Sequence, residues 1–189
     1  MSSAGLSNVS RLVQRYIDGR EVNVGILGDE TLPIAEIAFN MPKGMWRIVS
    51  YRSKWETGSD EDVGAQPRCP AEIEPSLAAE LKRIALAAWR AVGGESAGYG
   101  RVDFRIDRAG HPWLLEVNAN PDIAPDAGLA RMARAAGLDY GALVRNVCER
   151  ALARREVPSE DRWTLAQRLS GVAVDGDPDV LDLFAGAPR

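Results

Sequence analysis

Two runs of alternating apolar and polar residues, separated by a short polar break, constrain the fold of this 189-residue chain more than any other feature. They lie in residues 98–122, GYGRVDFRIDRAGHPWLLEVNANPD, and each has the period of two that marks a β-strand. The break at Arg108–His111 fits a hairpin turn centred on Ala109 and Gly110. The stretch therefore predicts an antiparallel hairpin with a defined register.

That register places two acidic side chains opposite each other, since Asp103 faces Glu116 and Arg101 faces Asn118. Opposed Cβ atoms in an antiparallel pair lie about 4.5–5.5 Å apart, so two like charges there are destabilising unless a positive group lies between them. A divalent cation is one such group, because carboxylate and amide oxygens suit hard ions such as Mg²⁺. The alternative is a hairpin whose polar face is only solvated.

The segments before the hairpin predict mainly strands. QRYID, REVNVGIL and LPIAEIAF are expected to form three strands before residue 40. Residues 40–69 are interpreted as a long polar loop, a length that is typical of functional or mobile segments.

Three helices are expected around the hairpin, at residues 75–92 and at about 127–136 and 140–154. The first has an apolar stripe made of Leu77, Leu81, Ile84, Ala88 and Val92. Between the other two, Gly137 is predicted to end one helix and Asp139 to cap the next. The pattern predicts an α+β fold, an antiparallel β-sheet with helices packed on one face and ligands on the other.

Charge and residue counts exclude several function classes. The 27 acidic and 23 basic residues are interspersed and give a net charge of -4, so no nucleic-acid partner is expected. No apolar run of membrane-spanning length and no signal peptide occurs, so we expect no membrane association and a cytoplasmic location. His111 is the only histidine, which excludes serine-histidine and cysteine-histidine catalysis. Cys69 and Cys148 are isolated, which excludes a CxxC or zinc motif.

Three segments, taken together, resemble a known family. DGREVNVGILGDETLPIAEI, YRSKWETGS, and the hairpin with its continuation to Tyr140 occur in the order and spacing of the ATP-grasp superfamily. Over residues 10–155 the chain resembles the catalytic C-terminal half of the D-alanine:D-alanine ligase branch. The resemblance implies an ATP-dependent carboxylate-amine ligase that acts through an acyl phosphate on small-molecule carboxylate and amine substrates. The alternative is a non-catalytic module that binds Mg-nucleotide or a partner.

The resemblance also implies roles for particular residues. Asp103, Glu116 and Asn118 match the ligands of two Mg²⁺ ions, with Mn²⁺ as an alternative metal, that hold the ATP phosphates. Arg101 matches the catalytic arginine that offsets negative charge as the acyl phosphate forms and reacts. Both roles agree with phosphoryl transfer, which depends on positioning and charge neutralisation.

Nucleotide binding is assigned to residues near the N-terminus and in the polar loop. Glu21 matches the acid that binds the ribose hydroxyls, and Lys54 matches a loop lysine that approaches the terminal phosphate, although a lone loop lysine is also explained as a solvated residue. The hinge that lies along adenine is matched by four consecutive residues, Gln14, Arg15, Tyr16 and Ile17. Without the family, these four would fit an ordinary strand.

The segment after the hairpin departs from the family. Ala127 stands where a serine that holds the acceptor amino acid is expected, so D-alanine is not the expected substrate. Asp122 and Asp126 are candidates to meet an amine, and Asp126 is equally explained as a helix N-cap.

The resemblance divides the chain into a catalytic domain at residues 1–155 and an extension at residues 156–189. The extension is predicted to form one helix, capped by Ser159, and a weakly ordered end. The N-terminal and central domains of the family are not visible in the chain. We therefore expect half of a two-lobed site, as a truncated chain, a degenerate product, or a subunit with a separate partner that supplies the other half.

Overall fold

The computed structural model describes residues 13–94 and 98–153. The chain divides into two units, Met1–Arg150 and Ala151–Arg189. The described residues belong to the first unit, except Ala151–Ala153, which form the last turn of the final helix. The predicted helix and chain end in residues 156–189 lie outside the described residues, and the domain boundary at residue 155 remains a prediction.

The described residues form one six-stranded antiparallel sheet. Its strands are β1 (Gly19–Leu27), β2 (Glu30–Thr31), β3 (Ala35–Phe39), β4 (Ala65–Arg68), β5 (Tyr99–Asp107) and β6 (Pro112–Asn118). The order across the sheet is β4-β3-β1-β5-β6, and β2 pairs with one end of β1. The helices are α1 (Tyr51–Trp55), α2 (Asp60–Gly64), α3 (Pro75–Ala91), α4 (Gly128–Ala135) and α5 (Tyr140–Ala153).

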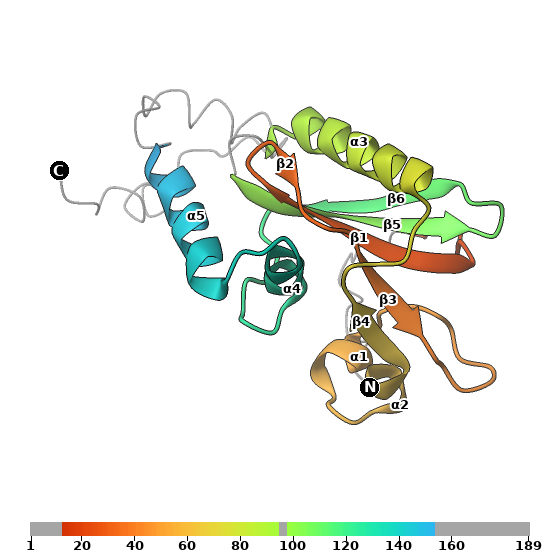
Figure 1. Cartoon of the computed structure of the whole chain (residues 1–189). Coiled ribbons are helices and arrows are strands. Elements are labelled where there is room, and N and C mark those ends of the chain that lie inside the picture. The colour runs from red at the N-terminus through yellow and green to blue at the C-terminus, as the bar shows by residue number, and fades with distance from the viewer. Residues whose placement is uncertain (1–12, 95–97, 154–189) are drawn as a thin grey trace, which may run out of the picture. The chain divides into compact units, whose positions relative to one another are not determined.

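Helix α3 covers one face of the sheet (Figure 1). It buries Leu81, Ala85 and Trp89 against the alternate side chains of β1 and β5. Those strand residues are Val22, Val24, Ile26, Val102, Phe104 and Ile106. Of the predicted stripe, Leu81 is fully buried, whereas Val92 follows the helix and is exposed. Because side chains alternate along a strand, the intervening polar residues of β1 and β5 point to the opposite face.

Helix α4 packs on that opposite face, at the β2 end of β1. A Cβ atom at Gly25 would lie 3.0 Å from Leu129 Cδ1 and 3.1 Å from the Met132 sulfur, so the helix rests directly on the strand backbone. Leu143 of α5 joins the same apolar cluster. The predicted α+β class and antiparallel sheet are confirmed. The helices are not confined to one face as predicted, because β1 presents Gly25 and Leu27 on the polar face and α4 packs against them, on the same side as the predicted ligand site.

The predicted helix ends are also confirmed. Gly137 has a φ of +85°, and the N–H of Leu138 donates to the carbonyl of Ala133, which is the pattern of a Schellman end for α4. Asp139 caps α5, since its Oδ1 accepts from the N–H of Ala142 at 2.7 Å.

Two predictions for the first half of the chain are wrong. Residues 14–18, the predicted strand QRYID, form no ladder, and β1 begins at Gly19. The predicted polar loop at residues 40–69 contains α1, α2 and β4. Both short helices begin at serine N-caps, Ser50 and Ser59, whose side chains accept backbone N–H groups. Serine is a strong N-cap, so this signal was present in the sequence.

Next to the hairpin turn, the pairing of β5 with β6 is shifted by one residue from the predicted register. Next to the turn, Arg105 pairs with Trp113 and Phe104 pairs with Leu114. The predicted turn centre would have paired Arg105 with Leu114 instead. Trp113 therefore lies opposite Arg105, where its indole N–H donates to Asp107 at 3.0 Å.

A β-bulge restores the predicted register before the strands reach the acidic pair. The irregularity lies opposite Asp103 and leaves Leu115 as the extra residue on β6. Beyond it, Asp103 pairs with Glu116 and Arg101 pairs with Asn118, as predicted. Without the bulge, the register at the turn would have paired Asp103 with Leu115.

Candidate functional site

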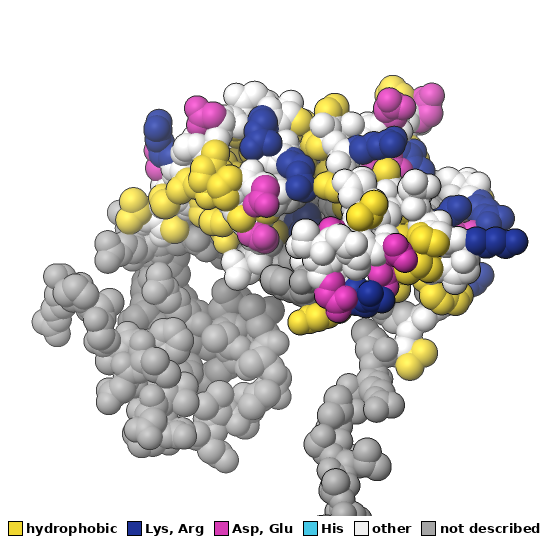
Figure 2. Space-filling view, turned by 90° about the horizontal axis from the view of Figure 1, so that it is seen from below, with side chains coloured by type: hydrophobic (Ala, Val, Ile, Leu, Met, Phe, Trp, Pro, Cys, Tyr) yellow, Lys and Arg dark blue, Asp and Glu magenta, His cyan; other side chains and the backbone are white. Residues whose placement is uncertain are grey.

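The polar face opposite α3 carries two directly opposed pairs of side chains between β1 and β5. Asn23 pairs with Asp103 near the middle of the strands, and Glu21 pairs with Arg105 one step closer to the hairpin turn. Acidic side chains lie beside basic ones on this side of the molecule (Figure 2). These two pairs of the candidate site are therefore positioned by the sheet.

Asp103 is buried and accepts three hydrogen bonds. Arg101 donates to it through Nε and Nη2, both at 2.7 Å, and Asn23 donates through Nδ2 at 2.8 Å. The same guanidinium lies 3.8 Å from Glu116 Oε1, a carboxylate whose side chain is 59% exposed. Arg101 thus supplies the positive charge that the opposed acids require, the role for which the sequence analysis proposed a cation.

Asn23 was missed by the sequence analysis, although the sequence contained a signal for it. It stands in REVNVGIL in alternation with buried Val22 and Val24, so the period of two places it on the same face as Glu21. Its contact with Asp103 fixes the orientation of that carboxylate.

Arg105 forms a second cluster, closer to the hairpin turn. It is 3% exposed and donates to Glu21 Oε2 at 3.1 Å. Its other hydrogen bonds go to the carbonyls of Ile17, Gly19 and Arg47 and to the hydroxyl of Tyr16. The sequence analysis assigned no role to Arg105.

A cavity of about 260 Å³ connects the two clusters. It is lined by Arg15, Tyr16, Ile17, Glu21, Ile48, Val49, Lys54, Asp103, Arg105, Leu115 and Glu116. The cavity brings together seven of the predicted site residues from four separate segments. Gln14 is exposed outside the lining, whereas Arg101 and Asn118 lie beside it on the strands that carry Asp103 and Glu116.

A larger cavity, of about 540 Å³, opens beside the start of β1 and the end of β3 and is lined by Asp18, Arg20 and Arg68 among others. None of the predicted catalytic, nucleotide or metal residues lines it. We therefore place the candidate site in the smaller cavity.

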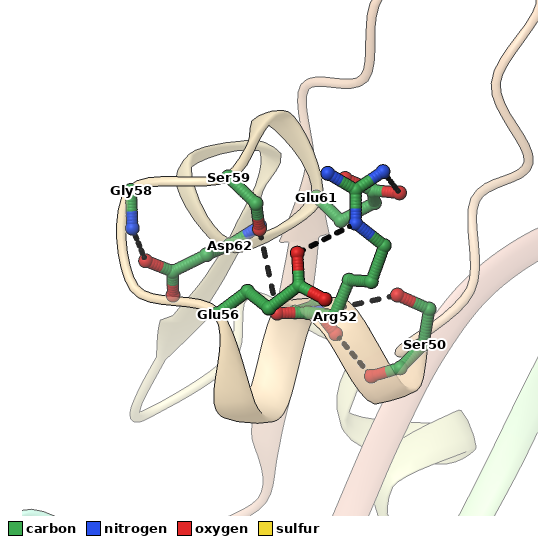
Figure 3. Close-up of polar contacts among 8 residues, drawn as sticks. Ser50, Arg52, Glu56, Gly58, Ser59, Glu61 and Asp62 are labelled. Atoms are coloured by element: carbon green, nitrogen blue, oxygen red, sulfur yellow. Dashed lines mark hydrogen bonds and ion pairs between the residues drawn. The ribbon is translucent and has the colours of Figure 1, made fainter.

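Lys54 reaches the smaller cavity from α1, and a compact polar network fixes the segment that carries it (Figure 3). Arg52 donates to Glu56 at 2.9 Å and to Glu61 at 3.2 Å, which joins α1 to α2. Asp62 accepts from the N–H of Gly58 at 2.8 Å. These contacts fix the backbone around Lys54, while the side chain of Lys54 itself stays exposed.

Burial and charge act in opposite directions on two ionisable groups of the site. Burial raises the pKa of Glu21 above its usual value, and the hydrogen bond from Arg105 only partly offsets this effect. Burial tends to lower the pKa of Arg101, but the hydrogen bonds to Asp103 overcome it, and the net pKa is raised. Arg101 therefore stays charged at any physiological pH.

The strand end after Asn118 is organised by side-chain to backbone contacts. Asn118 Oδ1 accepts from the N–H of Asn120 at 2.9 Å, and Asp122 Oδ1 accepts from the N–H of Ala124 at 2.8 Å. The N-cap of α4 is Ala127, with no side-chain cap, so the N-cap interpretation of Asp126 is wrong. Asp126 is exposed and lies one residue before the N-cap.

The donor set fits a hard divalent ion. Asp103 and Glu116 are directly opposed, and Asn118 follows on the same strand, so all protein donors are oxygens. Residues 13–94 and 98–153 contain no group of three His, Cys, Asp or Glu side chains suited to a metal. Two carboxylates and an amide match Mg²⁺, which usually fills its coordination sphere with water and substrate phosphates.

A sheet face with opposed carboxylates, arginines and a lysine around one cavity suits a phosphate-rich ligand with a bound metal. Residues 3–149 match the family described as D-ala D-ala ligase C-terminus, and the chain belongs to this family.

Named relatives agree with the family match. The chain is 34% identical over 154 residues to a D-alanine--D-alanine ligase of Bordetella petrii, covering 79% of this chain and 44% of the relative. A D-alanine--D-alanine ligase of Parvibaculum lavamentivorans is 36% identical over 144 residues, covering 74% and 43%. The chain thus spans about two fifths of the length of these relatives.

The fold is shared with solved structures. A D-alanine--D-alanine ligase from Bacillus anthracis complexed with ATP superposes with a TM-score of 0.56 at 23% identity, covering 76% of this chain and 42% of that one.

None of the described helices combines the length and the apolar composition that a membrane span requires.

Proposed function

We propose that this chain supplies the catalytic half of an ATP-dependent carboxylate-amine ligase. In this reaction a substrate carboxylate takes the terminal phosphoryl group of ATP, and an amine then displaces phosphate from the acyl phosphate to form an amide. The observation that carries the proposal is the single cavity that joins the predicted nucleotide residues, Lys54 and the opposed acids. The Bacillus anthracis relative that shares this fold was solved with ATP, which supports a nucleotide ligand.

Each part of the cavity has a proposed role. Arg15, Tyr16 and Ile17 lie along the adenine base of the nucleotide. Glu21 accepts hydrogen bonds from the ribose hydroxyls, and Lys54 contacts the terminal phosphate. The exposed ammonium of Lys54 needs no rearrangement of the core to reach a phosphate.

At the other end, Asp103, Glu116 and Asn118 would hold Mg²⁺, or Mn²⁺ in its place, and two ions agree with the family pattern. The metal would neutralise phosphate charge and orient the phosphates. Arg101 offsets negative charge on the reacting carboxyl group. Since Arg101 is bound to Asp103, its guanidinium is already held at the site.

The acceptor is proposed to be an amine other than D-alanine. Ala127 has no hydroxyl at the position where the family's serine is expected, whereas the neighbouring carboxylate of Asp126 is exposed and does not cap α4. Its charge suits an ammonium group. The small-molecule carboxylate is not specified by these contacts.

The site needs a second half, and we propose that an N-terminal and central region, in the same polypeptide or a separate subunit, covers the phosphates. A cytoplasmic location is part of the same proposal. The alternative function is a Mg-nucleotide-binding or partner-binding module without turnover.

Calorimetric titration with Mg-ATP tests the nucleotide site. We expect binding to the wild-type chain, at least about tenfold weaker binding by Glu116→Gln, and unchanged binding by the control Glu80→Gln, which is exposed on α3. Binding that does not depend on metal and is unaffected by Glu116→Gln would contradict the proposed site.

Phosphate release separates the ligase from the binding module. The assay supplies candidate amino acids with and without the N-terminal half of a relative. Turnover that requires both supports the ligase, and nucleotide binding without turnover under every condition supports the module.

A further inference from the structure

Arg105 is the most completely bonded charged side chain of the site, and its contacts converge from two segments that are far apart in the sequence. Residues 16–21 supply two carbonyls, the hydroxyl of Tyr16 and the carboxylate of Glu21, and the segment before α1 supplies the carbonyl of Arg47. The side chain is 4% exposed, so these contacts are shielded from water. A buried guanidinium with this many acceptors restricts both segments at once.

Aromatic rings complete the enclosure. The guanidinium carbon lies 5.3 Å from the centre of the Tyr16 ring and 5.7 Å from that of Phe39, within the range of cation-π attraction. Tyr16 in turn packs edge-on against Trp46, with ring centres 4.9 Å apart. Arg105 thus joins residues 16–19 to the segment around Arg47 through side chains as well as carbonyls.

The segments held by Arg105 have little regular structure of their own. Residues 13–18 form no strand, and residues 45–50 form neither helix nor strand. Both segments contribute lining residues to the cavity, among them Tyr16, Ile17 and Ile48. Because no ladder holds them, their position depends on contacts such as those of Arg105.

We propose that Arg105 is the positioning residue of the nucleoside end, fixing the base-binding segment and Glu21 before a nucleotide arrives. This inference rests on the proposed nucleotide site. Arg105 acts through Tyr16, Ile17 and Glu21, whereas Glu116 acts through metal and phosphate. Loss of Arg105 therefore weakens nucleotide binding by the same factor with and without Mg²⁺.

The experiment compares the full chain as wild type, Arg105→Met, Arg105→Lys and the control Arg134→Met. Arg134 is exposed and donates to a single carbonyl, that of Pro125, so its loss leaves the cavity intact. ADP affinity is measured with Mg²⁺ and with EDTA. Tryptic cleavage after Arg15 and Arg47 is followed by mass spectrometry, and circular dichroism checks the fold.

The expected result is about a tenfold loss of ADP affinity in Arg105→Met, by the same factor in both conditions, and several-fold faster cleavage at both arginines. Arg105→Lys keeps the charge but has a single ammonium in place of the planar fork, so we expect an intermediate effect on both measurements. If Arg105→Met does not fold, Arg105→Lys carries the test. Arg134→Met matches the wild type.

Two different results overturn two different statements. A wild-type chain that binds no ADP overturns the proposed nucleotide function. Unchanged cleavage after Arg15 and Arg47 in a folded Arg105 variant overturns the positioning role, whatever the wild type binds. An affinity loss in Arg105→Met that occurs only with Mg²⁺ also overturns it, because the residue would then act at the phosphate end.

Discussion

Arg101 and Arg105 lie on the same face of β5, and each pairs with a carboxylate, yet their surroundings differ. Arg105 is 4% exposed at its side chain and divides its donors among five acceptors in two segments. Arg101 is 21% exposed, directs its hydrogen bonds to Asp103 and lies within ion-pair distance of Glu116. The buried arginine holds distant segments of the chain together, while the more exposed one lies between two opposed acids.

The carboxylates differ in the same way. Glu21 is held by a buried arginine, and burial raises its pKa. Glu116 is largely exposed and lies 3.8 Å from Arg101, too far for a hydrogen bond. The Arg105 end of the site is therefore preformed, and the Arg101 end, for which we propose metal and phosphate binding, is open to solvent.

The largest effect on stability is expected from Arg105→Met. Removing the arginine leaves Glu21 buried without its partner, which typically costs about 3–5 kcal/mol of the free energy of unfolding. Urea denaturation at pH 7 measures the loss. A loss below about 1 kcal/mol would remove the distinction between the two arginines.

A smaller loss is expected from Arg101→Met. Its pair with Asp103 is partly exposed, and Asp103 keeps the hydrogen bond from Asn23, so we expect a loss of roughly 1–3 kcal/mol. The same urea titration compares both variants. If Arg101→Met were as destabilising as Arg105→Met, Arg101 would also have a mainly structural role.

Glu116→Gln should change the free energy of unfolding by less than about 1 kcal/mol, because its ion pair is long and exposed. We expect this small change to shrink further in 0.5 M salt, which screens exposed charges. Thermal unfolding at low and high salt measures it. A large loss would mean that the open end is more rigid than its exposure indicates.

The smallest effect is expected at the turn end of β5, where Asp107 accepts from the backbone N–H groups of Ala109 and His111 and from the Trp113 indole. These hydrogen bonds lower the pKa of Asp107 from 3.8 to about 2. A lowered pKa means that the ionised form stabilises the fold, so this contribution is present above pH 3.8 and is lost as the pH falls towards 2.

The melting temperature of Asp107→Asn should therefore lie below that of wild type at pH 6, and the difference should disappear near pH 2. Thermal unfolding at both values checks this. Asp29→Asn, which removes an exposed carboxylate in the turn between β1 and β2, is the matched control and should melt like the wild type at pH 6. A gap between Asp107→Asn and wild type that persists at pH 2 would mean that the carboxylate charge is not its source.

Most of the acidic end of the site could be predicted from the sequence. The pairing of Asp103 with Glu116 followed from two alternating runs and one turn, although it was reached through a bulge at Leu115 that the turn signal did not contain. Asn23 could have been found by extending the same alternation to β1. The metal and nucleotide roles of these residues remain predictions.

The Arg105 cluster could not be predicted. Its partners are 58 to 89 residues away in the sequence, and three of them are backbone carbonyls, which every residue has. The short helices α1 and α2 were missed for a different reason. Each has five residues, too short to show a helical period, although their serine caps were visible.

The sequence by itself determined the features that depend on neighbours a few residues apart. These are the strand faces, the ends of α4 and α5, and the face that carries Arg101, Asp103 and Glu116. Tertiary structure decided which arginine would be buried and which would stay open, and which segments line the cavity. Alternation and capping are local interactions, whereas the surroundings of a side chain depend on which distant segments pack against it.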